Sequence, residues 1–195
     1  MPSRKDPLMD AVREIHPKRI LELGVSVGKN AVCMITEAQS HCNDKRMVQY
    51  YGFDVFEQQS VWKELDDAPV TTLEKATELL SATGAEIHLI RGDSKVTLPE
   101  FVKTSRPMDL IYIDGGHSAE TIASDWENVK ILMHPKTVVV FDDYWDRLDG
   151  GCRAVIDALD RNMYAVNICE PGEMFPGDKR LAPSYLCRAV RVERR

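Results

Sequence analysis

Two kinds of hydrophobic pattern alternate along this chain. Short apolar runs rich in β-branched residues are typical of buried strands, and longer stretches with an apolar residue every three or four positions are typical of helices. Turn residues such as glycine, proline and aspartate follow most of the short runs. We predict strands at residues 19–24, 48–54, 86–91, 109–114, 137–141, 164–169 and 185–192.

Helices are predicted between these strands. The first begins at Asp6 and Pro7, a residue pair suited to a helix start. The most regular carries an apolar stripe from Ile122 to Met133. The alternation of strands and helices predicts an α/β sandwich with helices on both faces of the sheet. The remaining helices are expected near residues 28–40, 73–80, 95–103 and 155–159.

Length and composition favour a single domain over residues 1–195. With 44% hydrophobic and 29% charged residues, the chain can build a sizeable core. A net charge of −6 argues against binding to nucleic acids or anionic membranes, and no apolar run approaches the roughly 20 residues of a membrane span. The five cysteines are scattered and form no Cys-x-x-Cys pair, so we expect a cytoplasmic protein with reduced thiols.

Acidic residues end two of the predicted strands. Asp114 follows the run at 109–113, and Asp142 and Asp143 follow the run at 137–141. Because ligands bind beyond the carboxyl ends of strands in an open parallel sheet, these acids should converge at one functional edge. Three carboxylates there could hold a divalent cation, and the alternative is that they cap loops and helices.

A glycine-containing turn follows the first predicted strand. Gly24 permits a tight turn, Gly28 allows a ligand to approach the backbone, and the helix that follows offers its N-terminus to an anion. The motif lacks the third glycine of the dinucleotide fingerprint and the Gly-Lys-Ser/Thr of a P-loop. Asp54 ends the second strand, where it can accept hydrogen bonds from ribose hydroxyls. Asp93 follows the third strand, where it either accepts from an adenine amino group or caps the next helix.

Together these motifs resemble the class I S-adenosylmethionine-dependent methyltransferases. The ordered set is Glu22-x-Gly24-x-Ser26-x-Gly28, Asp54, Gly92-Asp93-Ser94 and Ile113-Asp114-Gly115-Gly116-His117. The segment from 109 to 144 narrows the resemblance to the methyltransferase type 24 family, and it is also similar to metal-dependent O-methyltransferases of sugars and macrolides. The resemblance covers roughly residues 18–168. It implies a Rossmann-like three-layer sandwich whose seven-stranded, mostly parallel sheet has an antiparallel last strand.

The resemblance also implies roles for individual residues. Asp54 would take the ribose hydroxyls, and Asp114 would lie near the sulfonium as both a catalytic residue and a metal ligand. Asp142 and Asp143 would complete a Mg²⁺ site, and His117 would be the general base; alternatively, His117 orders its turn or caps a helix. The cofactor-binding residues implied are Glu22, Gly24, Ser26 and Gly28 for the methionine end, Asp93 and Ser94 for the adenine, and Asp54 and Asp114.

Oxygen-ligated Mg²⁺ suits the methylation of a hydroxyl group, because a bound cation lowers the pKa of the oxygen beside it. The turn Asp114-Gly115-Gly116-His117 lacks the lysine of catechol-type enzymes, so a catechol acceptor is disfavoured. The expected partner is a hydroxylated small molecule or sugar, and the acceptor pocket must come from short loops or from a second subunit, which makes a homodimer possible. The loop at 170–183 is long enough to form a flap or an interface arm.

Two other functions remain open at the level of sequence. An NAD-dependent oxidoreductase would use the same type of fold, although the missing third glycine counts against it. A non-catalytic subunit that binds the cofactor without an acceptor is the second alternative. The presence of Asp114, His117, Asp142 and Asp143 argues against it.

Overall fold

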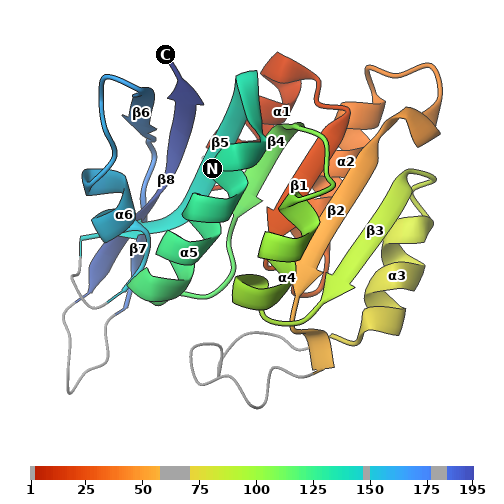
Figure 1. The fold of residues 1–195 in the computed structure, drawn as a ribbon, viewed down its shortest axis with the longest axis horizontal. Helices are drawn as coiled ribbons and strands as arrows, with labels where there is room; N and C mark the ends of the chain where they lie inside the picture. The colour runs from red at the N-terminus through yellow and green to blue at the C-terminus, as the bar shows by residue number, and fades with distance from the viewer. Residues whose placement is uncertain (1–2, 58–70, 147–149, 177–183) are drawn as a thin grey trace.

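A computed structural model of the chain describes residues 3–57, 71–146, 150–176 and 184–195 (Figure 1). The strands are β1 (Arg19–Leu23), β2 (Gln49–Asp54), β3 (Glu86–Arg91), β4 (Met108–Ile113), β5 (Met133–Trp145), β6 (Tyr164–Ile168), β7 (Glu173–Phe175) and β8 (Tyr185–Arg194). The helices are α1 (Asp6–Ile15), α2 (Lys29–Gln39), α3 (Leu73–Ser81), α4 (Ser94–Val102), α5 (Ala119–Val129) and α6 (Arg153–Asp157), with 3-10 turns η1 (Lys45–Met47) and η4 (Lys130–Leu132).

The strands form one sheet in the order β3-β2-β1-β4-β5-β8-β6, and β7 pairs with β8 outside this path. Strands β1 to β5 are mutually parallel, whereas β8 runs antiparallel to β5, β6 and β7. Strands β1 and β4 are neighbours in the sheet. From β1 the chain continues outward to β2 and β3 on one side, and from β4 it continues outward to β5 on the other side, so the direction of winding changes between β1 and β4. In such a sheet the ligand site is expected beyond the carboxyl ends at this switch point.

Helices cover both faces of the sheet, and each face has its own core (Figure 1). Helices α4, α5 and α6 pack on the front face around Leu98, Trp126 and Ile156. Helices α1, α2 and α3 pack on the other face around Leu8 and Met34. This burial on both faces explains the near-continuous apolar runs of the parallel strands, and it confirms the Rossmann-like three-layer sandwich.

Three details of the predicted elements differ from the structure. The stripe expected to reach Met133 stops earlier, because α5 ends at Val129, η4 follows, and Met133 opens β5. Strand β5 does not end at Phe141 but continues through Trp145. A short strand, β7, lies in the segment expected to be one long loop, so the sheet of the described residues has eight strands and not the seven expected. Residues 177–183 of that segment lie outside the described residues.

All five cysteines are free thiols; Cys33 is exposed, Cys42 is half-buried and the other three are buried. None of the helices in the described part of the chain has the length and apolar character that a membrane span requires.

Candidate active site

The glycine turn after β1 packs directly against the turn after β4. The Gly24 amide donates to the Phe53 carbonyl at 2.8 Å, and the Asp114 amide donates to the Leu23 carbonyl at 2.9 Å. Gly24 has a φ of +91°, and a Cβ there would lie 2.1 Å from the Asp114 carbonyl oxygen. Only glycine fits this position, since any side chain would push the two turns apart.

A cavity of about 450 Å³ opens beside this turn at the carboxyl edge of the sheet. Its size falls within the range of about 300–1,000 Å³ that is usual for small-molecule sites. Asp54 lies on the wall of this cavity. Its two carboxylate oxygens accept hydrogen bonds from the backbone amides of Ser26 and Phe56, each at 2.7 Å. The lining also includes Gly24, Val25, Val27, Lys29, Asn30, Gly92, Ser94, Asp114, Gly115, Gly116, His117 and Arg4.

Three residues predicted to bind the cofactor, Glu22, Gly28 and Asp93, lie outside this lining, although Val27 and Lys29 on either side of Gly28 belong to it. Asp93 is the N-cap of α4 and accepts the Lys95 amide at 2.9 Å, while its neighbours Gly92 and Ser94 face the cavity. Glu22 is fully buried on β1 and accepts a hydrogen bond from the Tyr50 hydroxyl. Its Oε1 has no hydrogen-bond partner among the described residues. Burial, opposed by the Tyr50 hydrogen bond, raises the pKa of Glu22 to about 8.

A β-bulge places two consecutive carboxylates at the same edge. Phe141 pairs with Val190 and Tyr144 with Arg188, so β5 contains one more residue than β8 across this interval. Asp143 takes the left-handed conformation there, with a φ of +59°. Adjacent strand residues normally point to opposite faces, and a bulge can re-aim one of them. Asp142 and Asp143 consequently contact the same side chain, that of Arg4.

His117 is held by the second of these acids. Its Nε2 lies 3.1 Å from Oδ2 of Asp143, and its ring packs edge-on against Trp145 with the centroids 5.8 Å apart. The hydrogen bond to Asp143 raises the pKa of His117. Burial would raise the pKa of Asp143, but the hydrogen bond and charge of His117, together with Arg4, hold it at about 2. An imidazole oriented by a carboxylate is an arrangement that can accept a proton.

Asp114 and Asp142 share two hydrogen-bond donors. The Tyr112 hydroxyl lies 2.8 Å from Oδ2 of Asp114 and 3.1 Å from Oδ2 of Asp142. The Lys5 ammonium contacts the same two oxygens and lies 2.9 Å from that of Asp114. Burial, reinforced by the charge of Asp142 and opposed by Lys5, raises the pKa of Asp114 to about 7.

Two basic residues that no sequence motif indicated also reach this cluster. Arg4 pairs with Asp142 and Asp143, and Lys5 pairs with Asp114 and Asp142. Adjacent basic residues before a helix are common at protein surfaces, so nothing in the local pattern distinguished them. The acids they contact lie more than 100 residues away in the sequence.

The donor set fits a hard divalent cation. A small cavity of about 10 Å³, roughly the space of one water molecule, is lined by Asp114, His117, Asp142 and Asp143. Ligand atoms of Asp142, Asp143 and Cys187 lie within 4.8 Å of one another, and Asp114 is joined to this group through Lys5 and Tyr112. Carboxylate oxygens suit Mg²⁺, whereas the thiol does not.

Comparison with known proteins identifies the family. Residues 21–144 match the family model of the type 24 methyltransferases, described as a methyltransferase domain. The chain therefore belongs to this family of S-adenosylmethionine-dependent methyltransferases. Among curated proteins, no sequence matches the chain.

Solved structures with the same fold include several methyltransferases. An O-methyltransferase from Bacillus cereus in complex with SAH superposes with a TM-score of 0.66 at 15% identity, covering 100% of this chain and 82% of that protein. CalS11, a TDP-rhamnose 3'-O-methyltransferase of calicheamicin biosynthesis, superposes with a TM-score of 0.59 at 22% identity, covering 92% and 77%. A Clostridium thermocellum protein provisionally described as an rRNA methylase gives 0.65 at 11% identity, covering 100% and 99%. At these identities the likeness is one of fold.

Proposed function

We propose that this chain transfers a methyl group from S-adenosylmethionine to a hydroxyl oxygen of a small molecule or sugar. The observation that carries the proposal is that the turn from Asp114 to His117 lines both cavities. The larger cavity is of a size to hold the cofactor, and the smaller lies within the acid cluster. His117 therefore stands where an acceptor would meet the cofactor.

The glycine turn and the strand ends supply the cofactor contacts. Gly24, Ser26 and Gly28 give the backbone approach for the methionine end, and Asp54 faces the cavity as the acceptor for ribose hydroxyls. Asp93 and Ser94 stand at the adenine end. Glu22 acts from beneath the turn, where its buried carboxyl group supports the loop from β1. S-adenosylmethionine supplies the methyl group, and the negative charge near Asp114 favours its sulfonium.

His117 serves as the general base. Because Nε2 donates to Asp143, the other ring nitrogen, Nδ1, carries the lone pair that accepts the hydroxyl proton. Asp143 stabilises the imidazolium that results. Asp114, Asp142 and Asp143 would hold Mg²⁺, which when bound would supply positive charge that lowers the pKa of the acceptor hydroxyl.

The chain's charge and cysteines support the remaining assignments. A net charge of −6 favours a small-molecule acceptor over a nucleic acid. The five free thiols suit a reducing compartment such as the cytoplasm. Membership of the methyltransferase family disfavours the alternative of an NAD-dependent oxidoreductase.

The test is formation of S-adenosylhomocysteine with a panel of hydroxylated sugars and small molecules, with Mg²⁺ and with chelator. We expect turnover with at least one hydroxylated acceptor, and its loss in chelator and in Asp142→Asn. Turnover that persists in both would remove the metal from the proposal. Cofactor binding without turnover on any acceptor would favour the non-catalytic alternative.

A further inference from the structure

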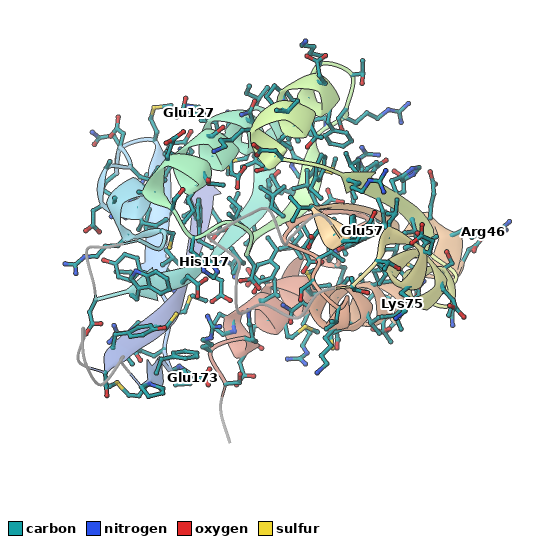
Figure 2. The ribbon with its side chains drawn as sticks, turned by 90° about the horizontal axis from the view of Figure 1, so that it is seen from below. Arg46, Glu57, Lys75, His117, Glu127 and Glu173 are labelled. Atoms are coloured by element: carbon teal, nitrogen blue, oxygen red, sulfur yellow. The ribbon has the colours of Figure 1, made fainter. Side chains whose placement is uncertain are left out.

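Arg4 and Lys5 lie just before α1 and extend into the carboxyl edge of the sheet. The strand arrowheads of β1 to β3 point down in Figure 1, and Figure 2 views this edge from below, with His117 and Glu173 on the same side of the molecule. The Arg4 side chain is only 15% exposed and that of Lys5 is 30% exposed. Two cations buried to this extent must be matched by nearby negative charge.

The same carboxylate oxygens that would bind a divalent cation are those that hold the two basic residues. Lys5 contacts Oδ2 of both Asp114 and Asp142, and Arg4 contacts Oδ1 of both Asp142 and Asp143. Mg²⁺ needs its oxygen ligands at about 2.0–2.1 Å. A guanidinium and an ammonium on those oxygens would lie within a few ångströms of the ion, and like charges this close repel strongly in a partly buried site.

Exchange between the two kinds of cation conserves charge. Three carboxylates face one guanidinium and one ammonium, whose combined charge of two equals that of Mg²⁺. Replacing the Arg4–Lys5 pair by one divalent ion therefore leaves the net charge of the cluster unchanged. With the three carboxylates ionised, a divalent ion added without this displacement would change the formal charge of the cluster from −1 to +1 in a partly buried site.

Arg4 also has a second set of partners that does not belong to the acid cluster. Its Nε lies 3.3 Å from a carboxylate oxygen of Glu173, and its guanidinium lies 5.1 Å from the ring centroid of Phe175. Both residues lie on β7. An Arg4 side chain released from Asp142 and Asp143 can therefore remain bound to β7. The N-terminal segment formed by Arg4 and Lys5 then has two discrete positions.

We propose that the Arg4–Lys5 pair and a divalent cation are alternative, mutually exclusive occupants of the cluster formed by Asp114, Asp142 and Asp143. This inference rests on the metal site of the proposed function. Arg4 also lines the larger cavity, so loading of the cation withdraws Arg4 from its wall. Metal binding then opens the part of the larger cavity that Arg4 lines.

The test measures Mg²⁺ binding by calorimetry to the full chain without cofactor or acceptor. We expect the double variant Arg4→Gln/Lys5→Gln to bind Mg²⁺ at least ten-fold more tightly than the wild type, because the competing cations are gone. Arg13→Gln is the matched control, since Arg13 lies on α1 with a 53% exposed side chain and pairs with Asp10. Its Mg²⁺ affinity should equal that of the wild type.

A second measurement follows the accessibility of the N-terminal segment formed by Arg4 and Lys5 in the wild-type protein. Limited digestion with trypsin, read by mass spectrometry, should cleave after Arg4 faster when Mg²⁺ is present, with cleavage after Lys103 unchanged. This readout does not depend on the double variant being folded. In the double variant, the melting temperature should rise with Mg²⁺ more steeply than in the wild type, because the unpaired acids regain a counter-charge.

Each contrary outcome has a distinct meaning. Mg²⁺ binding of equal affinity in the wild type and the double variant overturns the exchange while leaving the metal site of the proposed function intact. Binding of Mg²⁺ that leaves cleavage after Arg4 unchanged also overturns it. Absence of Mg²⁺ binding in both proteins overturns the exchange together with the metal site, and makes Arg4 and Lys5 permanent counter-charges.

Discussion

The Nε2 atom of His117 lies 3.1 Å from Oδ2 of Asp143, and this contact links the turn after one strand to the interior of the neighbouring strand. His117 follows β4, whereas Asp143 occupies the bulge of β5. Two backbone hydrogen bonds from the residues just before α6 support this pairing. The Gly151 amide donates to the His117 carbonyl at 2.8 Å, and the Cys152 amide donates to the Asp143 carbonyl at 3.0 Å. The orientation of the imidazole is therefore a property of the fold.

Replacing the proposed base should stop turnover without affecting the cofactor. In His117→Asn we expect kcat to fall by roughly 10²- to 10⁴-fold, the usual contribution of a general base. The dissociation constant of S-adenosylmethionine should stay within about two-fold, because a hydrogen-bonding side chain remains at the turn. Steady-state kinetics and calorimetry measure the two effects. His88→Asn is the control, since His88 is exposed on β3 and pairs with Glu86. Full activity in His117→Asn would leave His117 a turn-ordering residue.

The buried Glu22 should make stability fall as pH rises. Its pKa of about 8 in the folded protein exceeds the ordinary value of 4.5, so the native state binds more protons than the unfolded state between these values. Unfolding free energy therefore declines through this window, by up to about 1.4 kcal/mol per pH unit for one proton. Glu22→Gln should remove the contribution of this one proton to the decline of unfolding free energy with pH. Denaturant unfolding from pH 5 to 8 measures it.

The matched control for Glu22 is Glu74→Gln, a change at an exposed residue in the first turn of α3. Its stability should follow the wild-type curve across the same range. Parallel curves for Glu22→Gln and the wild type would show that Glu22 is ionised in the folded protein at neutral pH.

Gly24 should tolerate no side chain. In Gly24→Ala the new Cβ would meet the Asp114 carbonyl oxygen at 2.1 Å and the backbone would keep a φ of +91°, so we expect a loss of about 2–5 kcal/mol in unfolding free energy and loss of cofactor binding. Gly115→Ala is the paired control, because its Cβ would lie 3.5 Å or more from its neighbours. Its stability should change by less than about 1 kcal/mol. Equal effects in the two variants would contradict the close-packing argument.

Asp93 has two candidate roles that one pair of variants separates. Serine is as good an N-cap as aspartate, so Asp93→Ser should keep the stability of α4, whereas Asp93→Ala should lose about 1 kcal/mol. If Asp93 also accepts from the adenine, both variants should weaken S-adenosylmethionine binding, by about ten-fold for one hydrogen bond. We expect this weakening by calorimetry. Unchanged affinity in Asp93→Ser would restrict Asp93 to its observed bond with Lys95.

The order of strands and helices could be predicted because hydrophobic periodicity is a local property. Burial of the parallel strands on both faces produced runs such as that at 109–113, and glycines and acids marked their ends. The errors fell where local signals were ambiguous. Met133 continues a helical spacing but pairs with Met108 as the start of β5, and the acids at 142 and 143 resembled a strand end although β5 continues beyond them.

The sequence alone predicted that Asp114, Asp142 and Asp143 would converge at one edge, because the parallel strands of a sheet have their carboxyl ends on the same side. How the site is completed depends on contacts between segments that are distant in the chain. The direction of the Asp143 side chain depends on a one-residue mismatch between β5 and β8. The arrival of Arg4 at Asp142 joins residues 138 positions apart. Both depend on long-range packing and on the pairing of buried charges, which leave no periodic trace in the chain.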